Sequence, residues 1–194
     1  MANSNKRKGD RAEREAVAAI CRLAPDLVVA RPQRLFGAGR REDTGDLWVL
    51  PGVTVQVKHR ADPAQAIRLA ADGAATQAQR AESTFAVGLV PIPRAPSGAV
   101  RWVSCCTAWP GRLSEGLVAF RSVTAALQHV RRDDGDTPPR AHRVAVVERS
   151  PTAALFLGPL EAWVRAYRGV VLGHPMADPA PRLRAIEATP PRTR

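Results

Sequence analysis

The stretch DLWVLPGVTVQVKH, residues 46–59, sets the expectation for the fold. Apolar and polar residues alternate over residues 53–59, and this period of two is typical of a β-strand. The alternation predicts one face formed by Val53, Val55 and Val57 and an opposite face formed by Thr54, Gln56 and Lys58. Residues 46–50 are a second, mostly apolar run, so we expect two adjacent strands.

The tripeptide Leu50-Pro51-Gly52 fits a three-residue hairpin loop between these strands, because Gly52 suits the left-handed position of such a loop. A loop of this length pairs residue 49 with residue 53 and residue 46 with residue 56. Asp46 and Gln56 are then expected to face each other directly, with Lys58 two residues farther along. A two-residue loop would turn Asp46 to the opposite face.

Upstream of the hairpin, residues 9–24 carry small and aliphatic side chains at spacings of three and four, which predicts an amphipathic helix. Glu13 is expected to flank the buried stripe of this helix. Residues 1–8 are polar and basic, and we expect them to form a flexible arm. Residues 31–46 are rich in Arg and Gly without a clean period, which indicates a loop that faces a ligand.

The rest of the chain alternates between strand-like and helical patterns. Further strands are expected at 27–30, 85–92, 100–106 and 142–148, and helices at 62–82, 120–132 and 160–167. The order predicts an α/β fold in which helices enclose a sheet. The expected divisions are the basic arm (1–8), a core (9–135), an extension of one strand and one helix with unknown role (136–173), and a Pro-rich disordered tail (174–194).

The charge balance points to a polyanionic partner. The 194 residues contain 29 Lys plus Arg against 18 Asp plus Glu, a formal net charge of +11, which favours nucleic acid. A GC-rich genome that encodes Arg freely is the alternative explanation, since only Lys6, Lys8 and Lys58 are lysines. Against that background, Lys58 indicates a position that needs a compact ammonium group.

Several protein classes are excluded by the sequence. No run of about 18 apolar residues exists, so no membrane span is expected. The basic N-terminus is not followed by the apolar segment of a secretory signal. Three cysteines, two of them adjacent, form neither a disulfide framework nor a zinc motif. We therefore expect a reduced, cytoplasmic protein.

The residues around the hairpin have the chemistry of a divalent metal site. A metal that hydrolyses a phosphodiester takes hard oxygen ligands and keeps several waters. Such ligands could come from the carboxylates of Asp46 and Glu13, the amide oxygen of Gln56 and the carbonyl of Val57. Lys58 could orient the attacking water or stabilise charge on the transition state.

Three stretches together resemble a known family: KRKGDRAEREAVAAI (6–20), FGAGRREDTGDLWVL (36–50) and VTVQVKH (53–59). They are similar to the PD-(D/E)xK nuclease superfamily, and within it to the archaeal-type Holliday junction resolvases and their phage relatives. The likeness covers the first third of the chain and continues more weakly to about residue 106. It implies a restriction-endonuclease-like fold, a mixed central sheet flanked by helices. It also implies Mg²⁺ or Mn²⁺ dependence, cleavage of four-way DNA junctions, and a homodimer.

The resemblance carries over to four positions. Glu13 matches the acid of the first helix, Asp46 the acid of the motif, Gln56 its second acid and Lys58 its lysine. The family usually has Asp or Glu where this chain has Gln56. An amide keeps the acceptor oxygen but removes a charge, so we expect weaker metal binding, for which Asp43 is a reserve carboxylate.

DNA contacts are expected from basic residues and from two residues of the helix at 62–82. They are Lys6, Arg7, Lys8, Arg31, Arg34, Arg40, Arg41, Lys58, Arg60, Gln77 and Arg80. Contacts to phosphates give affinity without base specificity, and they predict strong salt dependence. Two alternatives stay open: a catalytically inactive DNA-binding module of the same fold, and a restriction- or repair-type nuclease that cuts linear duplex.

Overall fold

This computed structural model describes residues 2–35, 45–93, 100–111, 113, 117–131, 143–150 and 153–173. The helices are α1 (Ala2–Leu23), α2 (Pro63–Arg80), α3 (Val123–Arg131) and α4 (Leu160–Val171). The strands are β1 (Gln33–Arg34), β2 (Leu47–Trp48), β3 (Val53–Val57), β4 (Phe85–Pro93), β5 (Val100–Cys106), β6 (Val118–Phe120), β7 (Ala145–Ser150) and β8 (Ala153–Pro159). The predictions for Arg40, Arg41, Asp43 and the tail lie outside the described residues.

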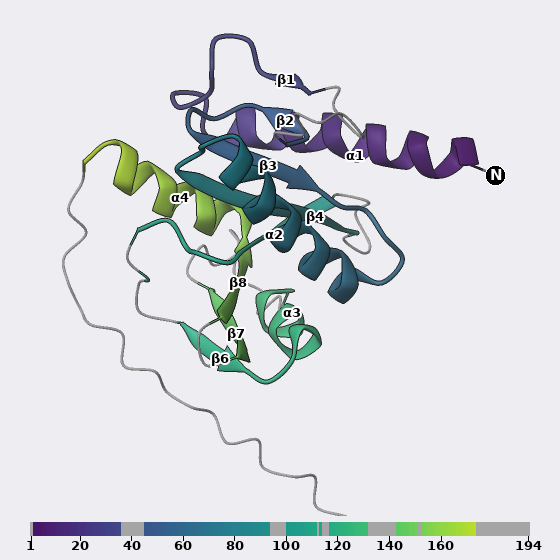
Figure 1. The fold of residues 1–194 in the computed structure, drawn as a ribbon, viewed down its shortest axis with the longest axis vertical. Coiled ribbons are helices and arrows are strands. Elements are labelled where there is room, and N and C mark those ends of the chain that lie inside the picture. Colours follow the sequence, from purple (N-terminus) through teal and green to yellow (C-terminus); the bar gives the residue numbers. More distant parts are fainter. Residues whose placement is uncertain are drawn as a thin grey trace, which may run out of the picture.

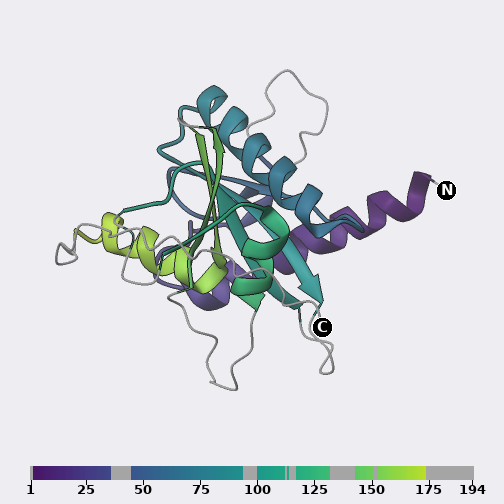
Figure 2. The ribbon, with the colours of Figure 1, turned by 90° about the horizontal axis from the view of Figure 1, so that it is seen from below.

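The described strands form one mixed sheet in the order β1-β2-β3-β4-β5-β8-β7-β6 (Figure 1). The pairs β3–β4 and β6–β7 are parallel, and the other neighbours are antiparallel. Helices cover both faces, and Figure 2 shows α2 and α4 on opposite sides of the sheet. The predicted α/β class, a mixed sheet flanked by helices, is therefore confirmed.

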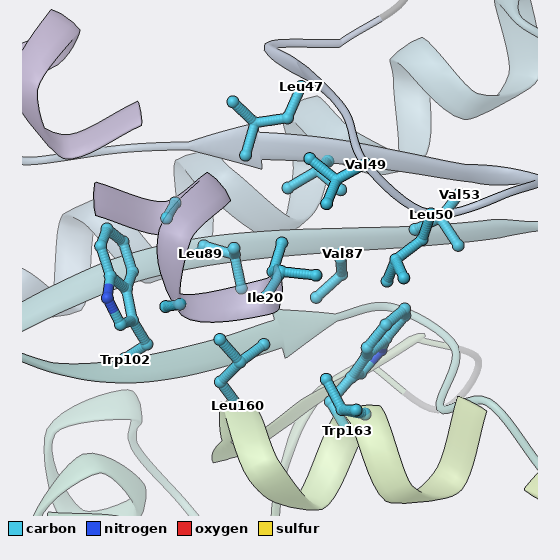
Figure 3. Packing of buried hydrophobic residues seen from close by; sticks show 14 of the residues in the cluster. Ile20, Leu47, Val49, Leu50, Val53, Val87, Leu89, Trp102, Leu160 and Trp163 are labelled. Atoms are coloured by element: carbon cyan, nitrogen blue, oxygen red, sulfur yellow. The ribbon is translucent and has the colours of Figure 1, made fainter. Parts of the chain in front are cut away.

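The first face of the sheet packs against α1 and α4. Figure 3 shows the cluster, in which Ile20 of α1 and Trp163 of α4 meet the strand residues Leu47 and Leu89. These four side chains are each no more than 1% exposed. Burying one such large side chain contributes roughly 1.5–3 kcal/mol, so this cluster holds the two helices to the sheet.

The second face packs against α2 and α3 through small residues. Gly88 of β4 lies so close to α2 that a Cβ there would be 2.5 Å from the carbonyl carbon of Ala70. Ala66, Ala70 and Ala74 are fully buried on the same side of α2. Because Gly88 has no side chain, the helix backbone can approach the strand closely.

The hairpin has the register that its loop predicts. Leu47 pairs with Val55, which is the same alignment as residue 46 opposite 56 and residue 49 opposite 53. Gly52 has φ +67°, the left-handed conformation expected for the loop. On β3, Val55 joins the cluster with α1 and Gln56 lies under α2, so the predicted alternation of faces is confirmed.

The first helix is longer than predicted. It begins at Ala2 instead of Gly9, so Lys6, Arg7 and Lys8 lie on its exposed early turns and do not form a separate arm. Lys and Arg are strong helix formers, and no proline interrupts the segment. Gly9 lies within α1, where a glycine lowers helix stability by only about 1 kcal/mol relative to alanine.

Three other local predictions are wrong. Residues 27–30 are turn and bend, not strand, and Val29 only donates its N–H to Val49 O at 2.9 Å. The expected loop 31–46 contains the short strand β1. α3 starts at Val123, because Phe120 ends β6 and the Ser122 hydroxyl caps the helix by accepting from Ala125 N.

In the described part of the extension at 136–173, residues 143–150 and 153–173, there are two strands and a helix where one strand and one helix were expected. The additional strand is β8, which pairs with β5 on one side and β7 on the other. The extension is therefore built into the same sheet as the residues before it. Its helix α4 also fills the cluster under α1 through Leu160, Trp163 and Val164.

Candidate active site

Asp46 lies directly before β2, at the end of its pairing with β3. There the Asp46 carboxylate, and not a backbone carbonyl, accepts the hydrogen bond from Val57 N. Oδ2 accepts from Val57 N at 2.7 Å and from Gln56 Nε2. Asp46 N donates to Val55 O at 2.8 Å. Gly45 has φ +121°, and a Cβ there would lie 3.2 Å from Val55 O. Glycine is needed before Asp46, and the predicted contact between Asp46 and Gln56 is present.

Gln56 is held from both sides. Its side chain is buried, with Nε2 directed to Asp46. Its Oε1 lies against α2, where a Cβ on Gly73 would be 3.3 Å away. Gly73, a poor helix former in the middle of α2, therefore makes room for the Gln56 amide.

Glu13 is on α1 and is paired with a cation from β1. Arg34 Nε donates to Glu13 Oε2 at 2.6 Å, and Arg34 Nη2 reaches Asp10 Oδ1 at 2.7 Å. Burial raises the pKa of the Glu13 carboxyl, the bond from Arg34 opposes that rise, and the negative charge of Asp46 adds to it. The two candidate carboxylates are thus close enough to repel each other.

Lys58 follows β3 directly, and its backbone continues the pairing with β4. Lys58 N donates to Leu89 O at 3.0 Å, and the residue is half-buried. Val57 N points the other way, toward Asp46. Because N–H and C=O of one strand residue point to the same side, the Val57 carbonyl is also directed toward the side of Asp46.

The predicted DNA-contact residues differ in accessibility. Those that lie exposed are Lys6, Arg7, Lys8, Arg31, Arg60 and Arg80. Gln77 is only 6% exposed, and the DNA contact predicted for it stays a prediction. Arg34 is engaged by Glu13 and Asp10 instead of being presented to a ligand.

Sequence reasoning missed Asp10 and the pairing of Arg34. Asp10 and Glu13 are three residues apart on a helix, so they share one face, and this spacing was a usable signal. The pairing with Arg34 spans 24 residues from Asp10 and 21 from Glu13, and no local pattern indicates it.

The donor set fits a divalent cation with fewer charges than usual. Within the described ranges, no group of three or more His, Cys, Asp or Glu is arranged to hold a metal. Glu13 and Asp46 supply two carboxylates, and the repulsion that Asp46 exerts on Glu13 is one that a cation would relieve. The amide oxygen of Gln56, predicted as a ligand, lies against α2, because Nε2 is the atom that faces Asp46. With a neutral oxygen from Val57, the two carboxylates suit a Mg²⁺ or Mn²⁺ ion that keeps several waters.

Comparison with known proteins adds no relative. No family model, no curated protein and no solved structure matches the chain. Among the helices of the described residues, none has both the length and the apolarity needed to cross a membrane.

Proposed function

We propose that this chain is a metal-dependent, structure-selective DNA endonuclease with a restriction-endonuclease-like fold. The observation that carries the proposal is the contact of Asp46 with Gln56 and Val57 N at the end of the β2–β3 hairpin. Glu13 is close enough to Asp46 for the negative charge of Asp46 to raise the pKa of the Glu13 carboxyl. The exposed Lys6, Arg7 and Lys8 and the net charge of +11 favour a DNA substrate.

Each residue has a distinct role in the proposed reaction. Glu13, Asp46 and the Val57 carbonyl would hold Mg²⁺ or Mn²⁺, which supplies Lewis-acid activation of the phosphate and of a water. Gln56 donates from Nε2 to Asp46 and thereby fixes the rotation of that carboxylate. The Lys58 ammonium orients the attacking water or stabilises the charge that develops on the phosphate.

The substrate we propose is branched DNA such as a four-way junction, cut by a homodimer that places one site on each of two strands. The test is cleavage of a labelled junction and of its matched duplex with Mg²⁺ or Mn²⁺. Asp46→Asn and Lys58→Ala are expected to abolish cutting. Asp26→Asn is the control, since it removes an exposed carboxylate that pairs with Arg168.

Three results of the cleavage experiment would decide between the proposed function and its alternatives. Junction cutting lost in both site variants and kept in the control supports the proposal. Equal cutting of duplex would favour a restriction- or repair-type nuclease. Cutting that survives Asp46→Asn would contradict the site. Light scattering of the purified protein checks the homodimer.

A second candidate is a DNA-binding module without cleavage. The observation that favours it is that both carboxylates already have partners inside the protein: Arg34 on Glu13, and Gln56 with Val57 N on Asp46. Tight junction binding in fluorescence anisotropy, without cutting in either metal, would support this candidate. Gln56→Glu, which restores the acid typical of the family, is then expected to gain cutting.

A further inference from the structure

Arg34 binds the acidic face of α1 through two nitrogens. Nε donates to Glu13 Oε2 at 2.6 Å, and Nη2 contacts both that oxygen and Asp10 Oδ1, the latter at 2.7 Å. The Arg34 side chain is 16% exposed and that of Glu13 is 19% exposed. This is a partly buried, charge-assisted arrangement, not a loose surface pair.

The Arg34 guanidinium contacts the Glu13 carboxylate, which is one of the proposed metal ligands. Both Arg34 nitrogens reach the same oxygen of Glu13. A guanidinium keeps its charge at any working pH, so it does not leave by losing a proton. A divalent cation on Glu13 would therefore stand next to a fixed positive charge, and the two cations would repel each other.

Asp10 gives Arg34 a second anchor. It lies one helical turn before Glu13 on the same face of α1. If Arg34 releases Glu13, it can keep its contact with Asp10 and stay attached to the helix. The pair of acids can thus hold the guanidinium in two ways, with Glu13 or without it.

We propose that Arg34 is a positioning residue that competes with the divalent cation for Glu13. Arg34 holds Glu13 in the absence of metal, and metal binding shifts the guanidinium onto Asp10 alone. Arg34 thereby sets the metal affinity of the site. This inference rests on the proposed function, because it requires a cation at Glu13 and Asp46.

The inference predicts that removing the guanidinium strengthens metal binding. Arg34→Gln is expected to bind Mn²⁺ at least about fivefold more tightly than the unaltered protein, the lower end of ordinary coupling between two ligands. Arg34→Lys is expected to lie between them, since an ammonium does not provide the forked contact to both acids. A merely structural role for Arg34 would give the opposite sign, with weaker binding once the helix and strand separate.

The experiment is a Mn²⁺ titration of the full chain, with free Mn²⁺ measured by electron paramagnetic resonance. Arg149→Gln is the matched control, because it also removes one positive charge from an ion pair, with Asp72, outside the site. Asp46→Asn identifies the binding that belongs to the site. Circular dichroism establishes that each variant is folded.

Four outcomes are distinguishable. Tighter binding in Arg34→Gln, unchanged binding in Arg149→Gln and loss in Asp46→Asn support the inference. An equal increase of Mn²⁺ affinity in Arg149→Gln would mean that the lost positive charge alone explains the change, and it would overturn the inference. Unchanged or weaker binding in Arg34→Gln, with Asp46-dependent binding intact, overturns it but leaves the proposed function standing. No Asp46-dependent binding in any variant contradicts both.

Discussion

The edge of the sheet around β1, β2 and β3 and its centre around β4, β5 and β8 are built on different principles. At the edge, polar groups are buried: Gln56 is 3% exposed and Thr54 is 2% exposed. In the centre, Leu89, Val103 and Leu155 are fully buried, and Ser104 is the polar side chain, donating to Gly158 O at 3.0 Å. One continuous sheet therefore combines an apolar middle with a polar edge.

The difference follows from what each region must do. Burying apolar side chains stabilises the fold without requiring directional contacts. Burial of the Gln56 amide and partial burial of the Asp46 carboxylate stabilise the fold only if their polar atoms have hydrogen-bond partners. The Asp46 carboxylate meets this condition by accepting two hydrogen bonds, from Gln56 Nε2 and from Val57 N. Substitutions in the centre are thus expected to change stability, whereas substitutions at the edge are expected to separate stability from the proposed activity.

The largest expected difference concerns thiol reactivity. Cys105 and Cys106 lie in the centre, where burial raises the pKa of both thiols and keeps them protonated. Cys21 is half-buried on α1. Native protein at pH 8 is expected to react with a thiol reagent at Cys21 only, with the other two slower by at least about a thousandfold, since they need global unfolding.

Cys105 and Cys106 are expected to stay far slower than Cys21 as the pH rises within the native range, because burial raises the pKa of both thiols and keeps the reagent away from them. Mass spectrometry after timed labelling measures each site. Urea-unfolded protein, in which all three react, is the control. Rapid native labelling of Cys105 would show that the centre opens locally and would break the comparison.

The next largest effect is expected at Gly88. In Gly88→Val the Cβ would meet the Ala70 backbone, 2.5 Å away, and backbone does not move aside cheaply. Overpacking of this kind costs typically 1–3 kcal/mol and more where backbone is hit, so a loss of about 3 kcal/mol is expected. Urea unfolding measures it, and a loss below about 1 kcal/mol would mean that α2 can shift.

Asp46 allows stability and the proposed activity to be separated at the edge. Asp46→Ala leaves the N–H of Val57 and the Gln56 amide without their acceptor, which is expected to cost about 1–3 kcal/mol. Asp46→Asn keeps an acceptor oxygen for Val57 N, so it is expected to abolish the proposed cleavage at a smaller cost in stability. Equal stability of the two variants would contradict a structural role for this carboxylate.

The features that the sequence predicts well are those determined by neighbouring residues. The hairpin register follows from a three-residue loop with Gly52. α2 begins at Pro63, and Asp62 is its N-cap, with Asp62 Oδ1 accepting from Ala64 N at 2.8 Å. The contact of Asp46 with Gln56 follows from the register alone. These patterns need no knowledge of the distant chain.

The features that it misses depend on distant partners. β8 is a strand because β5 and β7 lie on either side of it, and its own period is not distinctive. β1 has two residues and forms only by pairing with β2. Arg34 is drawn to Glu13 by charge across the fold, and a loop rich in Arg gives no indication which Arg will be used.

The smallest expected effect tests the far end of α1, beyond the part that packs on the sheet. Ala12 and Ala16 are buried, whereas a Cβ on Gly9 would meet nothing within 4 Å. Gly9→Ala is therefore expected to stabilise the protein by about 0.5–1 kcal/mol through helix propensity alone. Urea unfolding in the background of the unaltered protein measures this gain. No gain at all would mean that residues before Ala12 are not helical in solution, and Lys6, Arg7 and Lys8 would then act from a flexible arm and not from a helix that extends the edge.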